Sequence, residues 1–290
     1  MFSRSYRSRF PAALLAVTAA ALLPFIAVSC IRLIATAQYV GAAPLAGSPV
    51  RPEDSDDPEI SILVYHRFGP SVKDAMTVRT ATFRWQLDYL EQHGYTIIPL
   101  RALVSYLSGR APAPPRRSVV ITADDGHVSV FTEMLPVVRE HEVPVTLFVY
   151  PSAISNATYA MTWEQLDTLH RTGLFDIGSH TYWHPNFKIE RGRLSPTAYR
   201  AFAAMQLVKS RDVLRDKLRV EADVIAWPFG IHDHELIAIA REAGYTAGVT
   251  LERRVVTRRE AIMALTRGLL MQQDLWTKCP LDRTESDGGD

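Results

Sequence analysis

Ser118-Val119-Val120-Ile121-Thr122-Ala123-Asp124-Asp125-Gly126 is the stretch that decides the fold class of this chain. It begins as an apolar, β-branched run and ends abruptly in two carboxylates and a glycine. A second stretch has the same form, since Leu174-Phe175-Asp176-Ile177-Gly178 leads into Ser179-His180-Thr181-Tyr182-Trp183-His184. Both stretches place ionisable groups at the carboxyl ends of expected strands. Such positions are where α/β proteins gather their functional sites.

Strand-like and helix-like segments alternate along the chain around these two stretches. The expected strands are 60–65, 95–99, 119–122, 145–149, 175–179, 224–227, 246–250 and 264–270. The expected helices are 83–93, 100–107, 130–141, 162–171, 197–218 and 234–243. Short apolar strands joined by helices indicate a parallel sheet that is covered on both faces. About seven or eight such units predict an α/β barrel rather than a small open sheet.

The ionisable groups at the two strand ends suit a metal site. One carboxylate and two imidazoles are a sufficient ligand set for a catalytic zinc-type ion, with one position left for water. Asp124, Asp125, His180 and His184 supply these groups, and the second carboxylate can act as a base beside the water. Each pair alone has a plainer interpretation, as a surface coincidence or a helix cap. Their joint occurrence at strand ends predicts a metal-dependent hydrolase.

The composition of the chain describes an ordinary globular protein. Its 290 residues are enough for one large domain with a sizeable core. The hydrophobic fraction of 47% and the charged fraction of 22% exclude a disordered or fibrous chain. A net charge of +1 gives no reason to expect a nucleic-acid partner. The cysteines are Cys30 and Cys279, and the first lies in an apolar N-terminal segment, so we expect no disulfide in the domain.

The N-terminal segment predicts export. Three arginines precede the apolar stretch 10–31, which is long enough for a secretory signal or a single membrane anchor. Cleavage after Ala37, retention as an uncleaved anchor and lipidation at Cys30 are the three alternatives. All three place the domain outside the cytoplasmic membrane, as a periplasmic, envelope-anchored or secreted protein. A membrane is therefore an expected partner through this segment.

Changes in composition divide the chain into four parts. Residues 1–37 are the signal peptide or membrane anchor, and residues 38–59 are a flexible linker rich in Ala, Pro and acidic residues. Residues 60–275 are a single catalytic domain, and residues 276–290 are a polar tail.

The two strand-end motifs resemble the first two motifs of the polysaccharide deacetylases. The segments that carry this resemblance are Thr-Ala-Asp-Asp-Gly at 122–126 and Ser-His-Thr-Tyr-Trp-His at 179–184. This family of NodB-homology carbohydrate esterases (carbohydrate esterase family 4) has a distorted (β/α) barrel, so the resemblance implies a distorted (β/α)7–8 barrel over about 60–271. It also implies removal of acetyl groups from polymers of N-acetylglucosamine or from xylan.

The resemblance assigns roles to the four ionisable residues. It implies that Asp125, His180 and His184 bind the metal and that Asp124 is the general base toward the metal-activated water. Zinc is the expected ion from the ligand types, and cobalt and nickel also suit such a site. The metal would lower the pKa of the water and polarise the acetyl carbonyl.

Two departures from the usual family pattern point to one branch of it. The third family motif has an arginine that is absent from Ala226-Trp227-Pro228-Phe229-Gly230, and no histidine follows His234 to act as the C-terminal general acid. Val64-Tyr65-His66 ends the first expected strand and resembles the circularly permuted poly-β-1,6-N-acetylglucosamine deacetylases. The resemblance makes His66 the general acid, and a buried structural histidine is the alternative.

Four further residues are candidates for supporting roles. Arg267, on the last expected strand, replaces the missing arginine and orients Asp124, unless it forms an ordinary surface ion pair. Trp227 and Phe229 are the expected sugar-stacking pair, with Trp183 as a third candidate. Core packing is the alternative for each aromatic residue.

Several functions remain open from the sequence. The first is an exported, metal-dependent N-deacetylase of a poly-β-1,6-N-acetylglucosamine exopolysaccharide, as in biofilm matrices. The second is the same chemistry on peptidoglycan, chitin oligomers or xylan. The third is an inactive carbohydrate-binding barrel, and the fourth is an unrelated metallo-hydrolase barrel. The first three share a polysaccharide partner.

Overall fold

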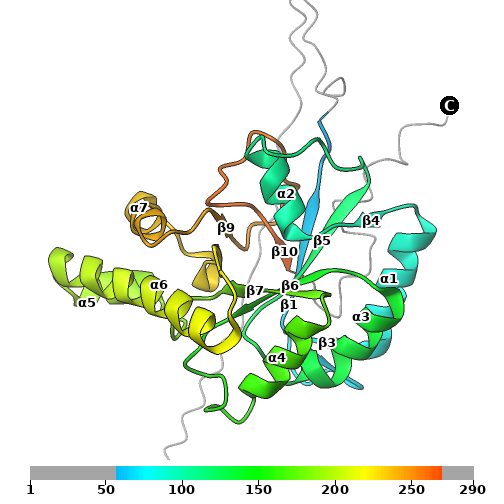
Figure 1. Ribbon diagram of the computed structural model, residues 1–290, viewed down its shortest axis with the longest axis horizontal. Coiled ribbons are helices and arrows are strands. Elements are labelled where there is room, and N and C mark those ends of the chain that lie inside the picture. The colour runs from blue at the N-terminus through cyan, green and yellow to red at the C-terminus, as the bar shows by residue number, and fades with distance from the viewer. Residues whose placement is uncertain (1–56, 270–290) are drawn as a thin grey trace, which may run out of the picture. The chain divides into compact units, whose positions relative to one another are not determined.

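The computed structural model describes residues 57–269 (Figure 1). The expected signal or anchor at 1–37, most of the linker at 38–59 and the tail at 276–290 lie outside the described residues, as do both cysteines. Among residues 57–269, no helix has the length and apolar character that a membrane crossing requires.

A curled parallel sheet forms the centre of the described domain (Figure 1). Its strand order is β10-β1-β5-β6-β7-β8-β9, and β4 pairs with β5 beside this path. Every strand pairing in this sheet is parallel. The strands are β1 (Ser61–Tyr65), β4 (Thr96–Ile97), β5 (Ser118–Ala123), β6 (Val145–Val149), β7 (Phe175–Ser179), β8 (Val224–Ala226), β9 (Ala247–Val249) and β10 (Gly268–Leu269).

The last described segment joins the two edges of this sheet. Leu265 forms a parallel bridge with Val249 of β9. Three residues later, Gly268 of β10 pairs with Leu63 of β1. The segment 265–269 therefore bonds to β9 at one end and to β1 at the other. The predicted distorted (β/α) barrel is confirmed.

Helices surround the sheet, with α5, α6 and α7 on one side and α1, α3 and α4 on the other (Figure 1). Their bounds are α1 (Thr80–Gln92), α2 (Leu100–Leu107), α3 (Leu135–His141), α4 (Trp163–Arg171), α5 (Phe187–Arg193), α6 (Pro196–Leu218) and α7 (His234–Glu242). The expected helix 130–141 consists of one π-helical turn, η2 (Val130–Met134), followed by α3. The sequence did not predict α5, nor the small parallel pair of β2 (Arg67–Gly69) and β3 (Thr77–Arg79).

Alternate side chains of β1 and β5 enter two different apolar clusters. Ile62 of β1 and Val120 of β5 belong to a cluster that includes residues of α2. Their neighbours Leu63 and Ile121 belong to a second cluster, which includes residues of α1 and α3. Both faces of these strands are therefore buried, which explains why the sequence shows continuous apolar runs instead of an apolar-polar alternation.

Candidate active site

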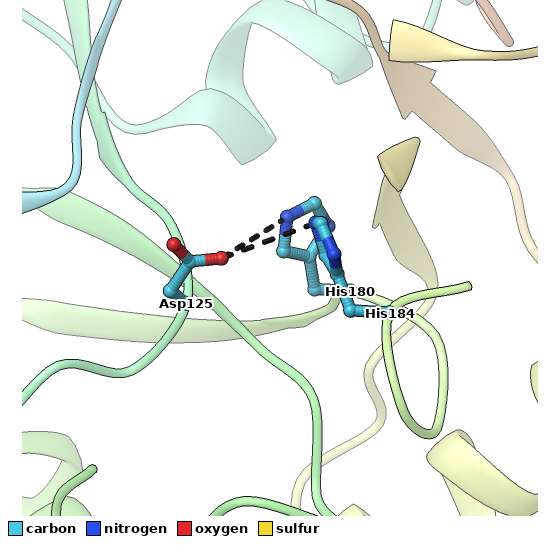
Figure 2. A group of neighbouring side chains, drawn as sticks. All are labelled: Asp125, His180 and His184. Carbon is cyan, nitrogen blue, oxygen red and sulfur yellow. Dashed lines mark ion pairs between the residues drawn. The ribbon is translucent and has the colours of Figure 1, made fainter. Parts of the chain in front are cut away.

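The carboxyl ends of β1, β5 and β7, with β6 between the last two, bring the predicted ionisable residues together. Asp124 and Asp125 follow β5, His180 follows β7, and His66 follows β1. Oδ1 of Asp125 lies 3.7 Å from Nε2 of His180 and 4.0 Å from Nε2 of His184. Figure 2 shows the Asp125 carboxylate directed at both imidazoles.

The arrangement of these donors fits a divalent metal ion. One donor atom from each of Asp125, His180 and His184 lies within 4.8 Å of the other two. Tetrahedral coordination with bonds of about 2.0–2.1 Å separates its donors by about 3.3 Å, so a small contraction is enough. Nδ1 of His180 lies 2.7 Å from the Ala226 carbonyl oxygen, to which it donates its proton. This bond leaves the Nε2 lone pair directed at the metal position.

His184 has the protonation state that metal ligation requires. Burial lowers the pKa of its imidazole, and the nearby His180 lowers it further. The two rings meet edge to face, with their centroids 4.5 Å apart. A histidine whose pKa is lowered is neutral at physiological pH, and the neutral imidazole is the metal-binding form.

Asp124 is buried against an arginine from the other end of the domain. Arg267 donates from both terminal nitrogens to the two carboxylate oxygens, at 2.8 Å and 2.7 Å, and neither side chain is appreciably exposed. The guanidinium also donates to Oγ1 of Thr122 and to the carbonyl of Thr250. Burial raises the pKa of Asp124, but the charges of Arg267 and His180 outweigh burial and lower it to about 2. Asp124 is therefore ionised at neutral pH, and the alternative of a surface ion pair is excluded.

His66 faces the same group of charges. Burial lowers the pKa of its imidazole, although the nearby Asp124 and Asp125 act in the opposite direction. Within the described part of the chain, its buried Nδ1 has no hydrogen-bond partner.

The structure contradicts the prediction that Trp227 stacks on a sugar. Its side chain is completely buried, and Nε1 donates to the Met263 carbonyl at 2.8 Å. The indole lies in an apolar cluster with residues of α6 and α7. Because both its rings and its single polar atom are used internally, Trp227 presents no surface to a polymer.

The other two predicted aromatic residues are exposed near the candidate metal site. Phe229 is 55% exposed, and its ring centroid lies 4.7 Å from that of His184. Trp183, which precedes His184, is 43% exposed and contacts Phe202 of α6. Both rings are available to a ligand.

The sequence did not single out Tyr150 and Tyr159, whose linked side chains lie beside His184 and His127. The Tyr150 ring centroid lies 5.4 Å from that of His184, and the hydroxyls of the two tyrosines share a hydrogen bond. The Tyr159 ring is nearly parallel to that of His127, with a centroid separation of 6.2 Å. Tyr150 directly follows β6, so the strand-end argument that identified Asp124 applies equally to it.

Comparison with known proteins agrees with this fold. Residues 111–248 match the sequence profile of the family described as "Polysaccharide deacetylase". The poly-β-1,6-N-acetyl-D-glucosamine N-deacetylase of Escherichia coli K12 is 26% identical over 211 residues, which cover 61% of this chain and 31% of that protein. The Staphylococcus epidermidis protein of the same name is 26% identical over 188 residues, covering 62% of this chain and 63% of that protein.

A solved structure shares the architecture. The structure of IcaB from Ammonifex degensii superposes with a TM-score of 0.66 and 26% identity, covering 74% of this chain and 92% of that chain. The present chain spans less than a third of the length of the Escherichia coli relative and less than two thirds of the staphylococcal one. The profile match and the shared fold place the matched region, residues 111–248, in the polysaccharide deacetylase family of hydrolases.

Proposed function

We propose that this protein is a metal-dependent N-deacetylase that hydrolyses the acetamide of N-acetylglucosamine residues in an exopolysaccharide of the poly-β-1,6 type. The products would be a free amine on the polymer and acetate. One observation carries the proposal: the donor set of Asp125, His180 and His184 lies beside the buried carboxylate of Asp124. The names of the Escherichia coli and staphylococcal relatives support the choice of polymer.

A divalent metal is part of this proposal. Asp125, His180 and His184 would hold it, with zinc expected from the ligand types and cobalt or nickel as alternatives. When bound, it would supply Lewis acidity to a water and to the acetyl carbonyl.

The proposed base is Asp124. Its carboxylate takes a proton from the attacking water, and Arg267 keeps that carboxylate ionised and fixed in orientation through two parallel hydrogen bonds. A base with so low a pKa needs a water that is itself made acidic, which is the chemistry that the metal would supply.

The proposed general acid is His66. Cleavage of the amide bond leaves an amine nitrogen that must gain a proton, and the His66 imidazolium donates it. The lowered pKa of His66 means that the ring is neutral at physiological pH, so it must gain a proton before the amine leaves, and once protonated it is a strong proton donor.

We also propose that the domain works outside the cytoplasmic membrane. The support is the basic and apolar character of residues 1–37, and a matrix polymer would be met on that side. The segment is cleaved after Ala37, retained as an anchor or lipidated at Cys30, and mass analysis of the protein from cell fractions distinguishes the three.

Acetate release tests the proposed reaction. The purified protein is stripped of metal, reloaded with zinc, cobalt or nickel, and given β-1,6 and β-1,4 oligomers of N-acetylglucosamine side by side. We expect metal-dependent release from the β-1,6 series. Release from the β-1,4 series alone would move the substrate to chitin or peptidoglycan. Metal binding without release from either series would contradict N-deacetylation and favour an esterase or a binding barrel.

A further inference from the structure

The long helix α6 places two buried polar side chains on its apolar face. Its buried residues are Tyr199, Ala203, Gln206, Leu207, Ser210, Leu214 and Leu218. Gln206 and Ser210 lie one helical turn apart, and neither is exposed. Burying an amide and a hydroxyl costs free energy unless hydrogen bonds compensate for the lost water. The hydrogen-bond partners of Gln206 and Ser210 therefore indicate what these two side chains do.

These partners belong to the loop that carries the two histidines. Oε1 of Gln206 accepts a hydrogen bond from the backbone N–H of Trp183, at 3.1 Å. Oγ of Ser210 lies 2.8 Å from Oγ of Ser179, which in turn accepts the backbone N–H of Thr181. The polar positions of α6 therefore support the segment between His180 and His184, and Gln206 does so directly.

This segment has an unfavourable backbone conformation. Thr181 and His184 have φ angles of 64° and 62°, in the left-handed region. A β-branched residue is a genuine outlier there, and such strain persists only where the surroundings impose it. The hydroxyl of Thr181 accepts the N–H of His184 at 3.1 Å, so side-chain oxygens hold three of the four N–H groups from 181 to 184.

The strained turn has a consequence for the candidate metal site. It folds the chain back so that the imidazoles of His180 and His184 lie side by side, with both Nε2 atoms near Oδ1 of Asp125. A relaxed loop would carry His184 away from this position. The bond from Trp183 to Gln206 ties the loop to α6, and the Tyr182 carbonyl also accepts the Ser152 N–H, at 3.0 Å.

We propose that Gln206 is a positioning residue for the metal site, holding the His180–His184 turn through the Trp183 N–H. This inference rests on the metal site of the proposed function. Among the described residues, Gln206 has no hydrogen bond to the three proposed ligands, so its action passes through the backbone of the loop. Its amide oxygen, and not merely its volume, is the group required.

Three substitutions separate the oxygen from the volume. Gln206→Met keeps the length and bulk of the side chain but removes the oxygen, whereas Gln206→Glu keeps an oxygen acceptor at the same position. Leu214→Met, on the same buried face of α6, is the matched control for repacking. We measure the zinc dissociation constant against a chelator, the visible spectrum of the cobalt-loaded protein, and hydrogen exchange of the Trp183 amide in the metal-free protein.

We expect Gln206→Met to weaken zinc binding by about 10- to 100-fold, the usual effect of losing a supporting contact behind a metal ligand. The cobalt spectrum should change and the Trp183 amide should exchange faster. Leu214→Met should stay close to the wild type in all three measurements. Gln206→Glu should keep the slow Trp183 exchange, because its buried carboxyl, held neutral by a raised pKa, still offers an oxygen acceptor. If Gln206→Met does not fold, Gln206→Asn replaces it, because the shorter side chain withdraws the oxygen from Trp183 but remains polar.

The inference would be overturned if Gln206→Met matched the wild type in zinc affinity, in the cobalt spectrum and in the exchange rate of the Trp183 amide. Equal losses in Gln206→Met and Leu214→Met would also overturn it, because they would mean that only packing matters. A wild-type protein that binds neither zinc nor cobalt would instead count against the proposed function. In that case unchanged Trp183 exchange in Gln206→Met would still reject the role of Gln206, and faster exchange would support its hold on the turn.

Discussion

Asp124 and Arg267 form a buried pair of opposite charges, and the carboxylate depends on the guanidinium for its ionised state. Both carboxylate oxygens accept hydrogen bonds from Arg267. A buried carboxylate without such a partner would have a raised pKa. The same contact therefore stabilises the fold and keeps the proposed base in its reactive form.

This pair predicts how stability depends on pH. Because the folded-state pKa of Asp124 is about 2 and its ordinary value is 3.8, its contribution is present above about pH 4 and is lost as the pH falls toward 2. The contribution is about 2 kcal/mol. We expect urea unfolding of the metal-free protein to show this loss, and the difference between wild type and Asp124→Asn to shrink over the same range. If the free energy of unfolding of the two proteins changed in parallel with pH, this predicted contribution of Asp124 would be wrong.

Substitutions at the proposed ligands and base should separate metal binding from catalysis. Asp125→Ala and His184→Ala each remove a donor, so we expect loss of both bound metal and turnover. Asp124→Asn leaves the donor set intact, so metal should remain while the rate falls by about 10²–10⁴-fold. Metal analysis and acetate release check these results. Loss of metal in Asp124→Asn would show that this carboxylate is itself a ligand.

His66→Ala tests the proposed general acid. We expect acetate release to fall by about 10²–10⁴-fold with metal content unchanged, because the leaving amine loses its proton donor. His170→Ala is the matched control, since His170 is a partly buried histidine of α4 that contacts the Phe175 carbonyl. It should retain wild-type turnover. Full turnover in His66→Ala would require a different acid.

At the scale of elements, the short connection after β8 gives two nearby aromatic residues opposite environments. Trp227 still bonds like a strand residue, donating its N–H to the Val249 carbonyl, and its side chain enters the core. Phe229, two residues later, has a φ of 56° within the turn η3 (Pro228–Gly230) and is exposed beside His184. The backbone turn, rather than residue type, separates a core residue from a surface residue.

Paired substitutions test this separation. Phe229→Ala should raise the KM for an oligosaccharide about tenfold, equivalent to about 1.4 kcal/mol, and change the free energy of unfolding by less than about 0.5 kcal/mol. Trp227→Ala should lower the free energy of unfolding by about 3–5 kcal/mol, because it empties a buried volume. Steady-state kinetics and urea unfolding measure both. An unchanged KM for Phe229→Ala would remove Phe229 from the binding surface.

The helix missed by sequence analysis shows the limit of local patterns. α5 buries only Phe187, so it lacks the repeated apolar spacing that identifies a helix. It begins because the Asn186 side chain accepts the N–H groups of Lys188 and Ile189. By contrast, α2, β6 and β7 coincide with their expected bounds, since they carry strong apolar runs or apolar spacing.

At the scale of the whole molecule, the domain depends on a segment close to its C-terminal limit. The segment 265–269 joins β9 to β1 and carries Arg267, which lies 143 positions from Asp124 in the sequence. Both the closure of the sheet and the neutralisation of the buried carboxylate come from this one segment.

Removal of this segment should therefore be far more damaging than loss of its charge. We expect a chain that ends at Glu260 to have no cooperative unfolding transition, because β1 and β9 each lose the partner on one side and Asp124 loses its counter-charge. Full-length Arg267→Met keeps the backbone pairing, so it should remain folded and lose about 3–5 kcal/mol. Circular dichroism during urea titration measures both. A shortened chain with the wild-type midpoint would mean that closure is dispensable.

The sequence by itself determined the class of fold and the edge at which the candidate site lies. Apolar runs that end in Asp124-Asp125 and in His180 are local features, and parallel strands bring their carboxyl ends to one edge in any such sheet. The sequence offered Arg267 as the partner of Asp124 and left a surface ion pair open, and only the tertiary structure decided between them. Only the structure, too, showed that Trp227 is core and that Gln206 bonds to the histidine loop. These contacts join residues far apart in the chain, so they depend on sheet closure and helix packing, which no local pattern encodes.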